Sequence, residues 1–167
     1  MINWQLSAAY FVHMLASVVW VGGIALAVLV VWPAAQRVLN DESEQLLVEW
    51  QRRFSPLVML SLVALVVTGL IQMSANPNYT GLFKIDNVWS AAILGKHIAF
   101  GVMVVISAYL AWGLYPQMAR LPLLAIKHKA QAIEIRATLR RRQIRLNRLN
   151  LICAVLVLAF TAIARVV

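Results

Sequence analysis

Two histidines and a lysine are the residues of this sequence whose types and positions could do chemistry inside a membrane. His13 lies in an apolar stretch, 6–32, that has no formal charge, and Lys96 and His97 are the only basic residues of another, 89–114. Ionisable side chains at membrane depth are costly and usually face the interior of a helix bundle. Imidazole nitrogens bind transition metals and haem iron, and a lysine can pair with an anion or transfer a proton. We therefore expect these residues to form a functional site.

The composition predicts the kind of fold that must position them. The chain has 167 residues, of which 62% are hydrophobic and 13% charged, which is too apolar for a soluble domain. A membrane-spanning helix needs roughly 20 apolar residues. Apolar stretches of suitable composition occur at about 6–32, 55–75, 89–114 and 149–164. We predict an all-α, integral membrane four-helix antiparallel bundle, with residues 1–167 as one domain and no cleavable signal peptide.

The basic residues predict the orientation of this bundle. Two of the three polar segments, 33–54 and 115–148, hold nearly all of the arginines and lysines, whereas the opposite face has only Lys84 and Arg165. The positive-inside rule then places the basic loop 115–148 in the cytoplasm and both termini outside. Within this loop, 125–148 reads as a basic helix that could continue into the fourth span. Its position beside the membrane favours anionic lipid as its partner and argues against nucleic acid, and docking of another protein stays open.

The depth of the two histidines suggests that they share a ligand. His13 lies seven residues past Leu6 and His97 eight past Trp89, so both lie roughly 10 to 12 Å below the outer surface. Their helices are diagonal in an up-down bundle, with axes roughly 14 Å apart. If each imidazole nitrogen reaches ~5 Å from its axis, a gap of about 4 Å is left, which suits a metal at about 2 Å from each nitrogen. This spacing favours haem b with two histidine ligands.

Other residues near the two histidines could complete a cofactor site. Ser17 beside His13 and Gly101 beside His97 are small and would leave room for a flat macrocycle, although small residues also simply allow close helix packing. Trp20 lies seven residues after His13, on nearly the same helix face. Lys96 could extend to the outer surface, pair with a haem propionate, or act as the catalytic acid or base.

Copper is the alternative metal. Imidazole and thioether both bind copper, so His13 and His97 could act with Met14 or Met73. Met14 is about 100° around the helix from His13, which makes a shared metal difficult. The methionines are also ordinary core-packing residues.

The order of these motifs resembles the copper-resistance D (CopD) membrane family. The resemblance consists of His13 with Trp20-x-Gly22-Gly23 and Pro33, then Arg53-Phe54, Thr68-Gly69, Lys96-His97 and the closing run from Thr161 to Arg165. It implies a multi-pass protein of the bacterial inner (cytoplasmic) membrane, tied to periplasmic copper handling and with relatives similar to b-type cytochromes. The chain departs from the longer members of that family because it has four spans and no additional domain. A looser similarity is to the HemJ type of protoporphyrinogen oxidase, whose histidine in span one and lysine in span three match His13 and Lys96.

These observations lead to one principal functional hypothesis and two alternatives. We expect haem b held by His13 and His97 in the outer half of the bundle, serving electron transfer linked to copper or another periplasmic redox partner. The first alternative is a haem-free copper-binding or copper transport protein, and the second is a HemJ-like oxidase that uses Lys96. Oxidoreductase activity and membership of a larger membrane complex both stay open.

Overall fold

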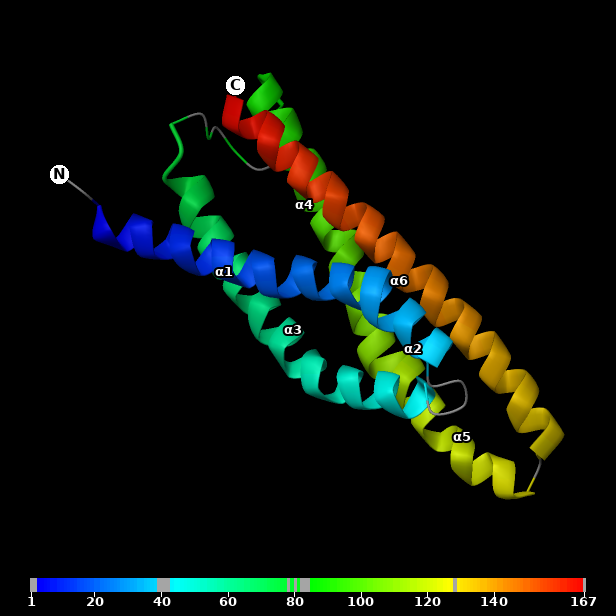
Figure 1. Ribbon diagram of the computed structural model, residues 1–167. Helices are drawn as coiled ribbons and strands as arrows, with labels where there is room; N and C mark the ends of the chain where they lie inside the picture. Colours follow the sequence, from blue (N-terminus) through cyan, green and yellow to red (C-terminus); the bar gives the residue numbers. More distant parts are fainter. Residues whose placement is uncertain are drawn as a thin grey trace.

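The protein consists of four long helical runs and no strand within the residues that the structure describes. A computed structural model describes residues 3–38, 43–77, 79, 81, 85–127 and 129–166. The runs Trp4–Val38, Leu46–Ser74, Val88–Leu121 and Ala130–Val166 are each long and apolar enough to cross a membrane. This arrangement confirms the predicted all-α membrane fold with four spans (Figure 1).

The helical runs extend beyond the predicted apolar stretches. They comprise α1 (Trp4–Leu26), η1 (Ala27–Val31), α2 (Trp32–Val38), α3 (Ser43–Ser74), α4 (Val88–Ala108), η3 (Tyr109–Leu114), α5 (Tyr115–Lys127) and α6 (Lys129–Val166). A helix needs an apolar surface only where lipid surrounds it, so polar residues can continue it into water. The segment 115–148 is accordingly helical on both sides of residue 128, and the basic helix and the fourth span are one helix, α6.

Side chains of asparagine begin the two helices that carry the histidines. The Oδ1 atom of Asn3 accepts a hydrogen bond from the Leu6 N–H at 3.2 Å. Asn87 forms a capping box, in which its Oδ1 accepts from the Ser90 N–H at 2.8 Å and the Ser90 hydroxyl oxygen accepts from the Asn87 N–H at 3.1 Å. Such caps satisfy backbone donors that have no partner within the helix, so both starting points are fixed locally.

Two segments of wider, π-helical winding explain how the first and third runs pass through prolines. In η1 the Trp32 N–H donates to the Ala27 carbonyl, and in η3 the Tyr115 N–H donates to the Leu110 carbonyl, each bond spanning five residues. Pro33 and Pro116 follow directly. A proline lacks an N–H and its ring collides with the carbonyl four residues earlier in an α-helix. The extra residue per turn relieves that collision, so the helix continues past Pro33, where the sequence suggested the end of the span.

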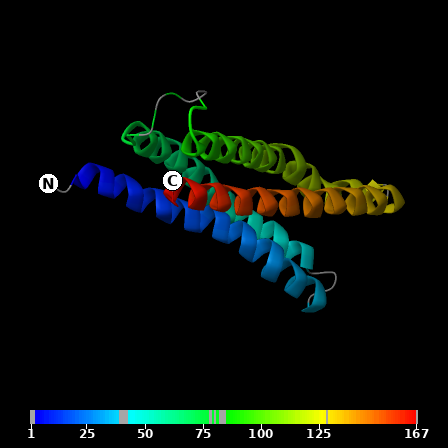
Figure 2. The same ribbon diagram turned by 90° about the horizontal axis from the view of Figure 1, so that it is seen from above.

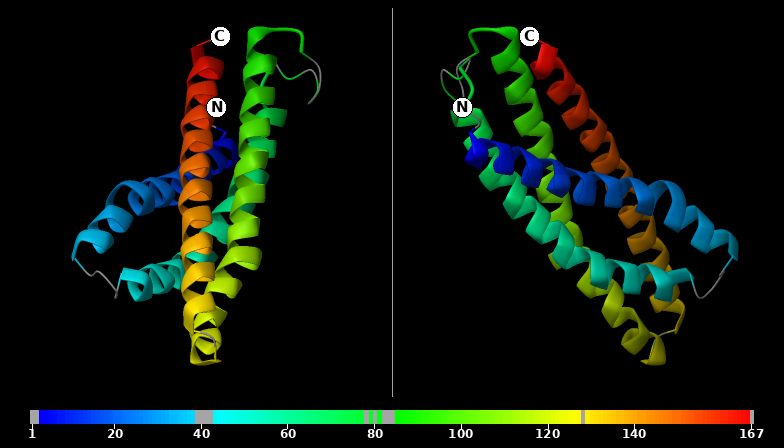
Figure 3. Two further views of the ribbon diagram at one scale, coloured as in Figure 1. Left: turned by 90° about the vertical axis from the view of Figure 1, so that its right-hand side faces the viewer. Right: turned by 60° about the vertical axis from the view of Figure 1, so that its left-hand side comes forward.

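The four runs pack as two pairs that cross. α1 packs against α3, and α4 packs against α6. The pairs meet around Trp20, which is 2% exposed and lies in a core cluster with residues of all four helices, Ala16, Ile24, Leu62, Leu65, Met103 and Ala154. Figures 2 and 3 show the pairs diverging toward the α2 and α5 ends. Following the predicted topology, we call the half that contains Trp4, Ser74, Val88 and Val166 the outer half, and the other the inner half.

Two glycines allow the closest contacts within these pairs. The Phe54 ring of α3 lies so near the Gly23 Cα of α1 that a Cβ atom there would overlap the ring. Between α4 and α6, a Cβ atom at Gly95 would lie 2.9 Å from Cζ of Phe160. Both positions need the absence of a side chain for close helix approach. The second glycine of the Trp20-x-Gly22-Gly23 run is thereby explained, whereas Gly22 has open space around it.

Candidate functional site

The imidazole of His13 is held against α3 in the outer half. Its Nδ1 lies 2.8 Å from the hydroxyl oxygen of Thr68, and the Thr68 hydroxyl donates to the Ala64 carbonyl at 2.5 Å. Because the hydroxyl proton of Thr68 is used in that bond, its oxygen accepts from an Nδ1–H of His13. The Nε2 atom of His13 is then unprotonated, with its lone pair free to bind a metal.

Neighbouring small residues fix the ring position of His13 further. A Cβ atom at Gly69 would lie 3.5 Å from Cε1 of His13, so the ring lies on the surface of α3 at this glycine. The Ser17 hydroxyl donates to the His13 carbonyl at 2.8 Å. Ser17 is therefore hydrogen-bonded to the backbone of its own helix and not to the imidazole. Thr68 and Gly69 of α3 lie against the imidazole ring.

His97 is held in a similar way by its own helix. Its Nδ1 lies 2.7 Å from the Ile93 carbonyl, which can only accept, so Nδ1 carries the proton. In the neutral ring, the Nε2 of His97 then keeps its lone pair. Hydrogen bonding of one ring nitrogen to a carbonyl or hydroxyl is how proteins orient histidines for metal ligation through the other. Both half-buried histidines meet this condition.

Lys96 lies beside one of the two histidines. It is half-buried on α4, directly before His97. On the α4 face that carries His97, Gly101 is exposed, and the space around its Cα is open. α3 and α4 are not among the extensively packed pairs of the described chain. The protein atoms thus leave the α4 face with His97 and Gly101 partly uncovered.

Trp20 lies deep in the packed interior of the bundle. It lies two turns inward from His13, within the core where the helix pairs cross, and its ring meets Phe100 edge-on with centroids 5.4 Å apart. Its inward side lines a cavity in the inner half. Nothing in these contacts joins Trp20 to the imidazole of His13, and its assignment to the cofactor stays a prediction.

The described part of the chain shows no cluster of side chains typical of a metal site with several protein ligands. Across the described residues there is no group of three or more histidine, cysteine, aspartate or glutamate side chains that could hold one. Met14 is 66% exposed, whereas Met73 is 9% exposed, one turn beyond Gly69 on α3. Of the two methionines, only Met73 lies on an inward face. His128 falls outside the described residues.

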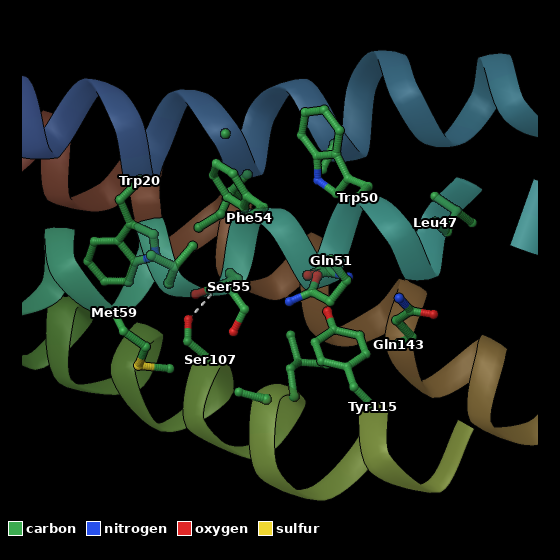
Figure 4. Close-up of a pocket in the computed structure, with 18 of the residues that line it drawn as sticks. Trp20, Leu47, Trp50, Gln51, Phe54, Ser55, Met59, Ser107, Tyr115 and Gln143 are labelled. Atoms are coloured by element: carbon green, nitrogen blue, oxygen red, sulfur yellow. Dashed lines mark hydrogen bonds between the residues drawn. The ribbon is translucent and has the colours of Figure 1, made fainter. Parts of the chain in front are cut away.

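The sequence analysis missed a second polar cluster, which lies in the inner half. Ser107 of α4 and Asn150 of α6 are hydrogen-bonded at 3.2 Å, and Gln143 and Tyr115 lie on the wall of the same cavity (Figure 4). The spacing of Gln143, Asn147 and Asn150 is that of one helix face, which could have revealed them. Gln143 and Asn147 were overlooked because they precede the fourth apolar stretch and were counted as loop residues, whereas Asn150 lies just inside that stretch.

Comparison with known proteins supports one of the two resemblances. No curated protein and no solved structure gives a significant match to the chain. The family described as Copper resistance protein D matches residues 48–164, which is more than half of the chain and includes Arg53-Phe54, Thr68-Gly69 and Lys96-His97. The first span, with His13, precedes the matched region, and the match does not bear on HemJ. The chain therefore belongs to the copper-resistance D family of membrane proteins.

Proposed function

We propose that this protein holds one b-type haem between His13 and His97 and transfers electrons in copper handling at the outer side of the membrane. The observation that carries the proposal is that an oxygen atom lies within hydrogen-bond distance of Nδ1 in both imidazoles. Each Nδ1–H is bound by an oxygen acceptor, at 2.8 Å in His13 and 2.7 Å in His97. Each Nε2 lone pair is thereby available as an axial ligand.

The ligand count favours haem over a bare metal ion. Four of the six ligands of haem iron come from the macrocycle, so two histidines complete the set. The described residues contain no group of three or more histidine, cysteine, aspartate or glutamate side chains, so a bare copper ion would have only the histidines and a thioether such as Met73 to bind it. When bound, haem would supply one-electron redox chemistry. His13 and His97 would fix its orientation, and Thr68 would keep the His13 ring from rotating.

The positive charge of Lys96 in the outer half also favours haem over a bare metal ion. Lys96 directly precedes His97 on α4, and an ammonium group there would oppose the binding of a bare cation. The same ammonium would attract the carboxylates of haem propionates. The open space at Gly101 and the limited packing of α3 on α4 would admit a flat macrocycle beside His97.

Absorption spectroscopy tests this proposal directly. Wild-type protein purified from haem-replete cells should show a Soret band and, on reduction, a sharp α band of low-spin iron. His13→Ala and His97→Ala should lose these bands, whereas His128→Ala, the same change at the third histidine, should keep them. Colourless wild-type protein would overturn the haem assignment.

Copper binding without haem is the second candidate, because the family is named for copper resistance and because Met73 lies buried one turn from the residues that contact His13. It predicts one copper ion per chain after dialysis against Cu(I), no visible haem bands, and loss of copper in His13→Ala and Met73→Leu. Retention of copper in both variants would exclude this site.

The cellular setting forms part of the same proposal. We place the chain in the bacterial inner membrane with both termini outside, and the arginines of the first half of α6 against anionic lipid of the cytoplasmic leaflet. A redox partner or a larger membrane complex would then meet the outer half, where the histidines lie. Reconstituted vesicles test the lipid contact, because binding of a peptide spanning residues 129–148 should require anionic lipid and weaken with salt.

A further inference from the structure

A groove lies between the inner end of the first run and α6. Figure 3 shows the first run crossing α6 and leaving it beyond η1. The walls of the groove come from η1, α2 and α6, and its volume is about 140 Å³. That is room for several water molecules, and therefore for a phosphate group. We call it the α2–α6 groove. Its walls contain neither His13 nor His97, so it is separate from the proposed haem site.

The groove lies at the level where both of its walls change from apolar to polar. Trp32, on one wall, is the last residue of the apolar stretch 6–32, and Arg148, on the other, directly precedes the stretch 149–164. In a bilayer this is the level at which acyl chains give way to headgroups, and tryptophan is enriched there. The groove is thus placed where lipid phosphates lie.

Arg148 gives the groove a positive charge that no carboxylate neutralises in the described part of the chain. The lining residues include no aspartate or glutamate, and the salt bridges among the described residues join Glu49 to Arg52 and Arg53. A guanidinium carries five N–H donors whose geometry matches phosphate oxygens. The same walls offer no partner to an ammonium group. They therefore favour a headgroup of net negative charge over a zwitterionic one.

Gln36 joins the two walls of the groove beside this charge. Its amide oxygen, oriented toward the two donors that face it, accepts from the Arg140 guanidinium of α6 at 3.1 Å and from the Trp32 indole N–H. Arg140 is half-buried, and this bond holds it next to the α2 wall. A second positive charge at the groove strengthens the local potential for an anion.

The remaining walls suit the apolar part of a lipid. Val28 of η1, Pro33 of α2 and Ile144 of α6 are half-buried and line the groove together with its polar residues. A soluble anion would leave these surfaces in contact with water, whereas the glycerol and acyl portion of a phospholipid would cover them. The combination of a guanidinium and apolar walls at this depth therefore fits a lipid better than a free anion.

We propose that the α2–α6 groove binds one anionic phospholipid, with Arg148 donating to its phosphate oxygens and with its glycerol and upper acyl part against Val28, Pro33 and Ile144. This inference rests on the proposed contact of α6 with anionic lipid and makes it specific. The contact described above is an attraction of many arginines to a charged surface. A site that α2 and α6 form together instead holds one lipid in a fixed position.

Native mass spectrometry of the full-length protein released from detergent micelles tests the site, because it counts bound lipids one by one. Phosphatidylglycerol is titrated against phosphatidylcholine with the same acyl chains. The first phosphatidylglycerol should bind about tenfold more tightly than phosphatidylcholine, since the walls pair with phosphate and not with the choline cation. Inorganic phosphate, which has no apolar part, should leave the bound lipid in place.

Variants separate the groove from diffuse attraction. Arg148→Gln should weaken binding of the first phosphatidylglycerol about tenfold. Arg145→Gln removes the same charge from an exposed position one turn away that does not line the groove, and should leave the affinity nearly unchanged. Gln36→Leu should also weaken binding because Arg140 loses its link to α2, whereas Gln117→Leu, the same change at an exposed position of α5, should not. Circular dichroism verifies that each variant stays helical.

Three results would overturn the site. Equal losses in Arg148→Gln and Arg145→Gln would leave only diffuse attraction of α6 to the membrane. Unchanged affinity in Gln36→Leu would remove α2 from the site. Displacement of the lipid by inorganic phosphate would make the groove a site for a soluble anion. The peptide spanning residues 129–148 lacks α2, so its failure to bind anionic vesicles would contradict the diffuse contact alone, and the comparison of Arg148 with Arg145 would still decide on the groove.

Discussion

The ring of Phe54 on α3 lies directly on the Cα of Gly23 on α1, and it also stacks on Trp50. These two residues belong to separate motifs of the sequence, one in the first span and the other before the second. Their contact fixes how closely α1 and α3 approach in the inner half. It also sets the position of Phe54 on the wall of the cavity in the inner half.

Replacing Gly23 by alanine should therefore destabilise the protein. The new methyl group displaces the Phe54 ring, and overpacking of this kind costs about 1–3 kcal/mol. Gly22→Ala, the same change beside open space, should be neutral or stabilising by up to about 1 kcal/mol because alanine favours the helix. The free energy of unfolding in mixed micelles measures both. Adding Phe54→Leu to Gly23→Ala should recover part of the loss, and equal stability of the two alanine variants would contradict the contact.

Replacing Thr68 by valine should weaken cofactor binding at His13. The change keeps the shape but removes the oxygen that accepts from Nδ1–H, so the ring loses its fixed tautomer and orientation. Loss of such a partner typically lowers metal affinity by about 10- to 100-fold. Haem content and reduced spectra of the purified variant give the measurement. Thr161→Val is the matched control, because Thr161 donates only to the Val157 carbonyl of its own helix. An equal loss in both variants would remove the special role of Thr68.

Side-chain size at Gly69 should act on the same imidazole. A Cβ atom there would lie 3.5 Å from Cε1 of His13, an ordinary contact distance, so Gly69→Ala should keep haem binding. Gly69→Leu adds atoms where the ring lies and should displace it, with loss of the low-spin spectrum. Circular dichroism confirms that both variants stay helical. Full haem content in Gly69→Leu would show that the His13 ring does not need its position on α3.

The orientation can be tested by thiol labelling in intact cells with a permeable outer membrane. In a Cys153→Ser background, Tyr79→Cys should react with a membrane-impermeant maleimide, because the segment between α3 and α4 is predicted to face outside. Ala137→Cys, on the basic half of α6, should react only after the cells are lysed. Both positions are exposed on the protein surface, so a difference reports the side of the membrane. The reverse pattern would place both termini in the cytoplasm.

The fold was predictable because hydropathy directly indicates where a chain can cross lipid. The four apolar stretches became four helical runs, but their ends lie elsewhere, since a helix continues into water wherever its backbone bonds are kept. Pro33 was interpreted as the end of the first span, and the helix instead passes it through η1. That outcome depends on a local change of winding, which composition does not reveal.

Residue counting predicts a common depth for the two histidines, but it cannot predict the orientation of their side chains. Counting along each helix placed His13 and His97 at one level, but the helix that each ring meets depends on how the pairs cross. Thr68 was noted as a polar residue of the outer half, and its bond to His13 follows only from the packing of α1 on α3. Trp20 shares a helix face with His13, and crossing of the pairs buries it against Met103 and Ala154. The roles of His13, His97, Lys96, Ser17 and Gly101 toward a cofactor stay predictions.

α6 runs without interruption for 38 residues, which corresponds to about 57 Å of helix, whereas the apolar part of a bilayer is about 30 Å thick. Roughly half of this rod must therefore project beyond the lipid core, and its projecting half carries the arginines. If the arginines bind a charged surface as proposed, a rod without a flexible joint between its halves would transmit that attraction as a tilt of the membrane-embedded half. Phe160, which lies against Gly95 of α4, is the point where such a tilt would reach the helix of His97. Under that proposal, the charge of the membrane surface would be mechanically linked to the geometry of the histidine site.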